Sequence, residues 1–350
     1  MSGARWVVLE PLDTIAVRDG RAFDAGMNTE AQTMTPTPST VAGAIGAAYG
    51  AAPGAGRADP DARGSVLPER IRGPFVVRRA GSHWQARWPI PRDVVRPQSR
   101  RGLIRLHVAY LNEGERTDLG LGAFLDDGGR RVEPVEGWWN TRWLTAYLHD
   151  GDVNAGWLED PWLPERRVGL ARNKDRTAMN GMLYSTRHFR LLEGYGLAAC
   201  CLGGPERDLR GLVHLGGRGR RAEVHQVEEI ALPELPPDFP GGRVLLYLAT
   251  PAVFPGGDWR PSLNRWPGAE LVTAATGAPQ PVTTVIANRS RVRDGLLMWA
   301  VPPGSVYYLR FPDEKVAAEA AAYLYEHGLD QAEEWMRTAG FGTALVGRWA

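Results

Sequence analysis

This chain of 350 residues has little cysteine and almost no lysine, and it lacks any long apolar run. Its two cysteines, Cys200 and Cys201, are adjacent. Neighbours on a strand point to opposite faces, so no structural disulfide is expected between them. No run approaches the roughly 18 uncharged apolar residues of a membrane span, and residues 1–13 lack the apolar core of a secretory signal. We therefore expect a cytoplasmic protein.

Signatures of catalysis and of metal binding are missing as well. The glycine-rich run at 216–219 has no Gly-Lys-Ser/Thr ending, which disfavours a Walker A nucleotide site. No HxxxH, CxxC or carboxylate cluster indicates a metal centre. None of the seven histidines lies in or beside residues 39–50, the first helix expected from the sequence. We expect no cofactor, no metal and no enzymatic activity.

Positive charge is supplied almost entirely by arginine. Lysine occurs only at Lys174 and Lys315, so 39 of the 41 positive charges are arginines, and 40 acids leave a net charge of +1. Two explanations for this arginine usage stay open. One is codon bias in a GC-rich genome, and the other is binding of nucleic acid, because guanidinium groups suit phosphates and stack on bases. The balanced net charge argues against a free-standing nucleic-acid binder. It suits a subunit that combines local basic surfaces with surfaces for protein contact.

Hydrophobic patterning predicts an α+β fold. A buried strand is expected at 5–9, and a helix at 39–50 with Ser39 or Thr40 as its cap. A hairpin is expected at 75–79 and 83–88, and a helix at 140–149. Strands dominate 166–227 and 243–311, followed by helices at 313–327 and 330–338 and a closing strand at 343–349. The length suits two domains, 1–150 and 151–350, and the small, Pro/Gly-rich residues 51–66 are interpreted as a mobile insertion.

The glycine-rich run and its arginines are a candidate phosphate site. Gly216, Gly217 and Gly219 allow positive φ and close backbone approach, which suits a phosphate held by amide groups. Further donors would come from Arg218, Arg220 and Arg221. The alternative is an ordinary hairpin turn with incidental arginines.

A second basic segment covers residues 166–190. It contains seven cations against one acid, Asp175, with Met179, Met182, Tyr184 and Phe189 interleaved. Cations mixed with apolar or stacking groups are typical of a single-stranded RNA groove. The candidate contacts are Arg172, Lys174, Arg176, Tyr184, Arg187 and His188. The alternative is a solvated, charged β-hairpin.

Two shorter features are weaker candidates. Arg18 and Arg21 flank a turn at Asp19-Gly20 and could meet a phosphate, or form a plain surface turn. Ser39 and Thr40 lie at a predicted helix N-terminus, where amide groups and the helix dipole favour an anion. Plain helix capping is the alternative for both residues.

The sequence also resembles a known family. Segments 11–23, 36–49, 168–191, 212–227 and 247–259, together with 340–349, follow one another as in the RAMP subunit of type III-B (Cmr) CRISPR complexes that binds the 5′ handle of the guide RNA. No residue-level match covers 51–66 or 92–137. The resemblance implies tandem ferredoxin-like (RRM-like) folds with a glycine-rich loop. It also implies a non-catalytic, antiviral role, with the crRNA, a large polymerase-cyclase subunit and a backbone RAMP subunit as partners.

Two other functions remain open. Some RAMP relatives process CRISPR transcripts, and His188 is a conceivable acid–base group, although packing or RNA stacking is the commoner role for such a histidine. A protein-only scaffold would suit the low net charge and the pair Trp138 and Trp139.

Overall fold

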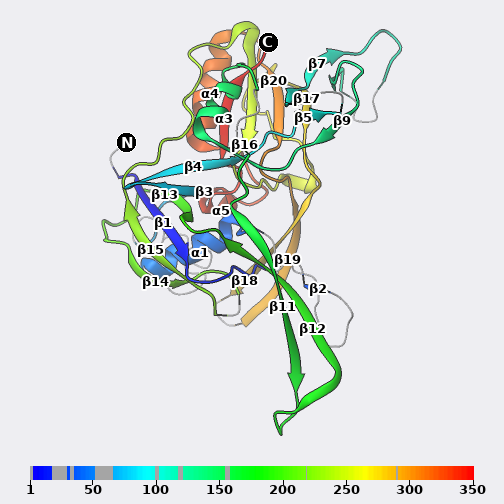
Figure 1. Ribbon diagram of the computed structural model, residues 1–350. Coiled ribbons are helices and arrows are strands. Elements are labelled where there is room, and N and C mark those ends of the chain that lie inside the picture. Colours follow the sequence, from blue (N-terminus) through cyan, green and yellow to red (C-terminus); the bar gives the residue numbers. More distant parts are fainter. Residues whose placement is uncertain are drawn as a thin grey trace. The chain divides into compact units, whose positions relative to one another are not determined.

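The computed structural model describes residues 3–17, 30–31, 35–51, 66–98, 102–116, 121–153, 158–217, 219–288 and 291–350. The chain forms two compact units, each assembled from three stretches. Unit 1 contains Met1–Arg79, Pro161–Glu229 and Pro281–Trp299, and unit 2 contains Ala80–Asp160, Ile230–Gln280 and Ala300–Ala350. Each unit contains residues from both predicted domains, 1–150 and 151–350. The predicted domain boundary at residue 150 stays a prediction. Figure 1 shows the elements of both units.

Unit 1 is built on antiparallel strands with β1 among them. The strands lie in the order β3 (Arg70–Ala80), β13 (Tyr195–Leu202), β1 (Arg5–Pro11), β15 (Arg221–Val227) and β14 (Arg210–His214). Consecutive residues Val7, Val8 and Leu9 have no exposed surface, so β1 is covered on both faces. Helix α1 (Pro38–Ala48) packs against β14.

A long hairpin extends from the same unit. Strands β11 (Trp162–Arg172) and β12 (Ala178–Leu191) pair in antiparallel fashion, and β2 (Glu30–Ala31) pairs in parallel with β12. Strands β18 (Gln280–Asn288) and β19 (Arg291–Ala300) form a two-stranded sheet. Figure 1 shows the β11–β12 ribbon running to a tip well away from β1.

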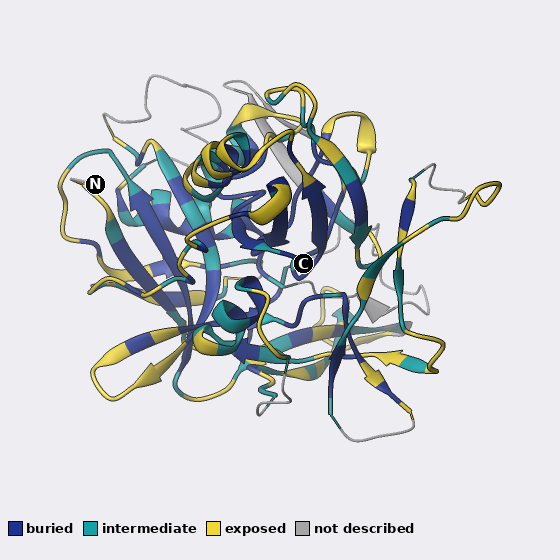
Figure 2. Cartoon of the chain, turned by 90° about the horizontal axis from the view of Figure 1, so that it is seen from above, coloured by how far each residue is buried: buried dark blue, intermediate teal, exposed yellow. Residues whose placement is uncertain are grey.

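Unit 2 holds a second antiparallel sheet with helices packed on it. Its strands lie in the order β17 (Glu270–Ala275), β20 (Val306–Arg310), β16 (Arg243–Leu248) and β21 (Ala344–Arg348). Helix α4 (Glu314–His327) packs on β16 and β21 through small residues that include Ala317, Ala320 and Ala321. Buried residues concentrate in the strands, while many loops and outer helix faces are exposed (Figure 2).

The remaining elements of unit 2 are short. Strand β4 (His83–Pro89) pairs with β10 (Trp138–Asn140), which leads into α3 (Thr141–Leu148). The other elements are β5 (Val94–Pro97), β6 (Ile104–Arg105), β7 (His107–Tyr110), β8 (Ala123–Asp126), β9 (Val132–Pro134), α5 (Glu334–Ala339) and the 3-10 turns η2 (Pro240–Gly242) and η3 (Pro255–Gly257). Within the described residues no helix is both long and apolar enough to cross a membrane.

A buried polar cluster fixes the start of segment 92–137, which has no counterpart in the resemblance. Asp93 has no exposed surface and accepts hydrogen bonds from Tyr147 Oη at 2.7 Å and Tyr308 Oη at 2.5 Å. Arg105 Nε donates to the same carboxylate at 3.2 Å. Burial, and secondarily Asp93, raise the pKa of both tyrosines well above the ordinary value. These donors compensate the buried charge and tie the segment to α3 and β20.

Most predicted elements are confirmed, and the mixed α+β class with them. Helix α3 is capped by Asn140, and α4 by Asp313, whose side chain accepts from Val316 N at 2.8 Å. Gly81 turns at φ 63° between β3 and β4, as the hairpin signal indicated. Both cysteines are free and buried, in agreement with the expected absence of a disulfide. The tandem ferredoxin-like arrangement stays a prediction, and the insertion at 51–66 lies almost entirely outside the described residues.

Two predicted helix starts are wrong. Helix α1 is capped by Thr37 and begins at Pro38, so Ser39 and Thr40 lie in its first turn. Proline is favoured at the first helical position, so the cap precedes it. Helix α5 begins at Glu334, four residues later than predicted.

Candidate nucleic-acid interface

Residues 13–17 of unit 1 join two of the predicted RNA-contact segments. They follow β1 and run beside the base of the β11–β12 hairpin, where Ile15 forms an antiparallel bridge with Phe189. The two backbone hydrogen bonds of this bridge measure 2.7 and 3.0 Å. On the other side, Gly217 N donates to Ala16 O at 2.7 Å. The hairpin and the glycine-rich loop are therefore neighbours, although their sequences are far from residues 13–17.

The glycine-rich loop is the turn between β14 and β15. Gly216 has φ 79°, and a Cβ there would lie 2.6 Å from Ala16 O. Gly219 has φ 68°, with nothing within 4 Å of its Cβ position. The Gly217 amide, one of those expected to hold a phosphate, is bonded to Ala16 instead. Packing on residues 13–17 thus explains the glycine at 216, whereas the turn conformation alone explains Gly219.

The loop arginines differ in their surroundings. Arg220 contacts the Asp13 carboxylate through Nη1, and its side chain is mostly buried. Arg221 is exposed at the start of β15, opposite His214. Arg218 lies outside the described residues. Of the two loop arginines that the structure describes, Arg221 is exposed to solvent and Arg220 is mostly buried.

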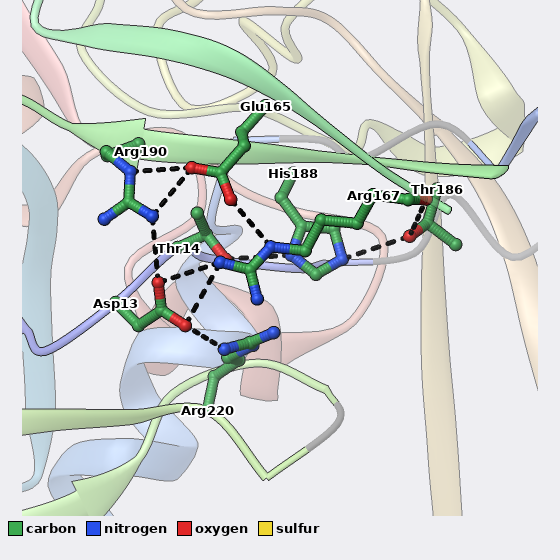
Figure 3. Close-up of polar contacts among 8 residues, drawn as sticks. All are labelled: Asp13, Thr14, Glu165, Arg167, Thr186, His188, Arg190 and Arg220. Atoms are coloured by element: carbon green, nitrogen blue, oxygen red, sulfur yellow. Dashed lines mark hydrogen bonds and ion pairs between the residues drawn. The ribbon is translucent and has the colours of Figure 1, made fainter. Parts of the chain in front are cut away.

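Asp13 and Glu165 gather three arginines, as Figure 3 shows. Arg167 donates to Glu165 at 2.7 Å and to Asp13 at 3.0 Å. Arg190 makes the same two contacts, at 2.7 and 3.1 Å. Desolvation acts to raise the pKa of Asp13, but the Thr14 amide, Arg167 and Arg220 outweigh it and lower that pKa. Hydrogen bonds from Arg167 and Arg190 lower the pKa of Glu165.

Sequence reasoning missed both acids of this cluster. Glu165 lies one residue before the basic window 166–190, and it shares a strand face with Arg167 by the two-residue period. The register places Leu163 opposite Arg190 and Glu165 opposite His188, which brings Arg190 diagonally to Glu165. No sequence signal locates Asp13, because its arginine partners are 154 to 207 residues away.

His188 is enclosed between two threonines. Its ring is 2% exposed, with Nδ1 2.9 Å from Thr14 Oγ1 and Nε2 3.3 Å from Thr186 Oγ1. Figure 3 shows the ring between both hydroxyl groups. This position favours the packing role that the sequence left open over an RNA-stacking role.

The tip of the hairpin carries exposed cations. Arg172, Lys174 and Arg176 are all exposed around a turn held by the side chain of Asn173. Asn173 Oδ1 accepts from the amides of Asp175 at 3.1 Å and Thr177 at 3.0 Å. The three predicted cations thus lie together around one turn.

The middle of the hairpin mixes cations with apolar groups on one face. Arg187 lies directly opposite Arg166, and both are exposed. Val168 and Leu170 follow on that face and are 61% and 46% exposed. On the other face Tyr184 covers Gly169, where an added Cβ would lie 2.3 Å from the tyrosine ring. Tyr184 is therefore half-buried by its cross-strand neighbour.

Two candidates gain less from the structure. Ser39 Oγ and Thr40 Oγ1 each lie 3.0 Å from Thr37 Oγ1, so their hydroxyl groups face a neighbour in the first turn of α1. Arg18 and Arg21 lie outside the described residues.

Within the described ranges, no three His, Cys, Asp or Glu side chains lie together in a group that could hold a metal ion.

Comparisons with known proteins identify the family. No curated protein matches the sequence. A chain of the "Cryo-EM structure of the Type III-B Cmr-beta bound to cognate target RNA and AMPPnP, state 1" is similar over 87% of this chain and 86% of that chain, with 15% identity and a TM-score of 0.51. A chain of the "Cryo-EM structure of the Type III-B Cmr-beta bound to cognate target RNA" covers the same shares at 15% identity, with a TM-score of 0.47. The first likeness is one of fold. A family model described as "CRISPR-associated protein (Cas_Cmr3)" matches residues 7–349, nearly the whole sequence, and the chain therefore belongs to the Cas_Cmr3 family of CRISPR-associated proteins.

Proposed function

We propose that this chain is a non-catalytic, RNA-binding RAMP subunit of a type III-B CRISPR complex, and that it holds the 5′ handle of the guide RNA. The observation that carries the proposal is the convergence of the hairpin base and the glycine-rich loop on residues 13–17. Family membership and the fold shared with a chain of an RNA-bound Cmr-beta structure support it.

The proposed RNA path runs along the hairpin. Exposed cations at its tip and on one face neutralise phosphates, while Val168, Leu170 and Met179, all exposed, offer apolar contact to bases. This combination binds single strands with little sequence preference. Binding of a defined handle then depends on shape and register more than on base reading.

The proposal includes the partners and setting implied by the family. The chain bridges the large polymerase-cyclase subunit and the backbone RAMP subunits in the cytoplasm, and it uses a tandem ferredoxin-like fold. Target cleavage and signal synthesis belong to those neighbours. The antiviral activity is thus a property of the assembly.

A transcript-processing nuclease is the main rival function. Its candidate acid–base group, His188, is enclosed by Thr14 and Thr186 and is 2% exposed. A general acid or base has to reach the proton that it moves, so this burial favours the non-catalytic proposal. The purified chain should not cleave repeat RNA with or without divalent metal. Specific cleavage that disappears in a folded His188→Ala variant would establish the nuclease instead.

A protein-only scaffold is the second rival. The sequence pair Trp138 and Trp139 would suit a scaffold, but Trp139 is 1% exposed and Trp138 is half-buried in β10. These tryptophans therefore contribute to the folded unit and lend the scaffold little support.

Co-purification from the native host tests the proposal. Tagged chain should be recovered in a multi-subunit particle that contains short RNAs with one common 5′ end. Sequencing of the bound RNA identifies that end. Recovery of the chain as an RNA-free monomer from cells that express the whole complex would contradict the proposal.

A further inference from the structure

The arginine cluster around Asp13 and Glu165 has an excess of positive charge. It combines three guanidinium groups, from Arg167, Arg190 and Arg220, with two carboxylates. The arginines come from the two strands of the hairpin and from the glycine-rich loop. Their side chains are 33%, 45% and 21% exposed, so the cluster borders solvent.

Each arginine still has donors to offer. Arg167 and Arg190 use only Nε and Nη2 toward the acids. In the part of the chain that the structure describes, Nη1 of neither residue has an acceptor. Arg220 Nε is buried without a hydrogen-bond partner. A guanidinium carries five N–H groups, and an anion beside the cluster would find several of them already oriented.

We infer that Arg167, Arg190 and Arg220 bind one backbone phosphate of RNA, and that Asp13 and Glu165 are positioning residues that hold the three guanidinium groups in place. The inference rests on the proposed function, since the ligand is a phosphodiester of the guide RNA. It adds Arg167 and Arg190, together with the two acids, to the residues predicted from sequence.

The role of the acids follows from charge and entropy. Three guanidinium groups this close repel one another, and each long side chain loses rotamer freedom when it is ordered. Asp13 contacts all three groups and offsets both costs before RNA arrives. A count of charges alone predicts the opposite, because removal of a negative charge would then strengthen RNA binding. Weaker RNA binding after removal of the Asp13 charge therefore indicates a positioning role, and stronger binding indicates a simple charge effect.

The test measures binding of a 5′-handle RNA oligonucleotide to the full-length chain by fluorescence anisotropy over a series of salt concentrations. Asp13→Asn should weaken binding about tenfold, the effect of losing one charge-assisted contact, with little change in the salt slope. Arg190→Gln should weaken binding by a similar factor and lower the salt slope of log affinity by about 0.7. Arg190→Lys keeps the charge but loses the fork, so it should keep the slope and lose affinity.

The Arg210–Asp208 pair provides matched controls. It lies at the far end of β14 from the loop, and its side chains are 78% and 60% exposed. Asp208→Asn and Arg210→Gln make the same charge changes and should leave affinity within twofold of wild type. Thermal melts check that every variant is folded.

The outcomes separate the inference from the proposed function. Tighter binding by Asp13→Asn would show that Asp13 competes with RNA, and wild-type behaviour of Arg190→Gln would remove the phosphate site; either result overturns the inference while RNA binding stands. If Asp13→Asn does not fold, the comparison of Arg190→Gln with Arg190→Lys decides. A wild-type chain that binds no handle RNA overturns both the inference and the proposed function.

Discussion

The hairpin tip offers the most quantitative test of phosphate contact. Arg172, Lys174 and Arg176 are exposed and close together in sequence, and we expect a variant with Gln at all three positions to bind handle RNA more weakly. On a single strand each neutralised phosphate contributes about 0.7 to the salt slope, so the loss of three contacts should lower the slope by about 2. The ratio of wild-type affinity to variant affinity should therefore be about fifty-fold larger at 0.15 M salt than at 1 M salt.

The stability of the folded chain should not change, which separates binding from folding. The turn is held by Asn173 and by backbone groups, and these are kept in the variant. Arg176 has φ 62°, a conformation that Gln adopts no less readily than Arg. Exposed substitutions of this kind alter stability by about 0.5 kcal/mol, so the melting temperature should stay within about 2 °C.

Salt-dependent binding of the variant and of a charge-matched control decides the question. Arg310→Gln, Lys315→Gln and Arg337→Gln together remove three positive charges from unit 2 and should leave the slope unchanged. A tip variant with the wild-type slope would refute the assignment of phosphates to the tip. An equal loss in both triple variants would show a general charge effect.

Three further predictions concern stability. Asp93→Asn should lower the free energy of unfolding by about 3 kcal/mol in urea denaturation, because its buried arginine partner loses a counter-charge; an unchanged midpoint would refute this role. Burial raises the pKa of Tyr147 and Tyr308 in the folded chain. Their contribution to the free energy of unfolding is therefore complete below the unfolded pKa of about 10 and falls as the pH rises above that value. Melting temperatures that stay level from pH 9 to 11 would contradict this prediction. Gly216→Ala should lower the free energy of unfolding by about 3 kcal/mol, because its Cβ would meet a carbonyl oxygen at 2.6 Å. Gly219→Ala should lower it by about 1 kcal/mol, for its φ of 68° alone. Equal losses would contradict the packing of the loop.

The elements that could be predicted from sequence are those with local signals. Asn140 and Asp313 are caps with accepting side chains, and each precedes an apolar stripe that one helix face buries. Helix α1 shows that such a signal was present but misassigned, because Pro38 fixes the first helical position and Thr37 the cap. Local rules were sufficient in each of these cases.

Helix α5 shows where tertiary contacts override a local pattern. Residues before Glu334 were predicted helical, but Ala332 N donates to Val253 O at 2.7 Å. Gln331 Oε1 accepts from Val253 N at 2.8 Å. These bonds hold the segment against a distant loop in a non-helical conformation, and periodicity within the segment carries no information about them.

The candidate site was predicted in its parts but not in its arrangement. Basic composition pointed to the hairpin and to the glycine-rich loop, and both lie at one place in unit 1. The junction itself depends on Ile15 meeting Phe189 and on Ala16 meeting Gly217, pairs separated by more than 170 residues. Charge counting also gave no sign that Arg220 forms an ion pair with Asp13.

Crosslinking of guide RNA within the assembled complex tests the central claim most directly. Ultraviolet irradiation followed by mass spectrometry identifies the peptides of this chain that are joined to nucleotides of the 5′ handle. We predict that the crosslinked peptides come from residues 166–190 and 214–221 of unit 1. Crosslinks to the handle found only on peptides of unit 2, or only on other subunits, would contradict the account.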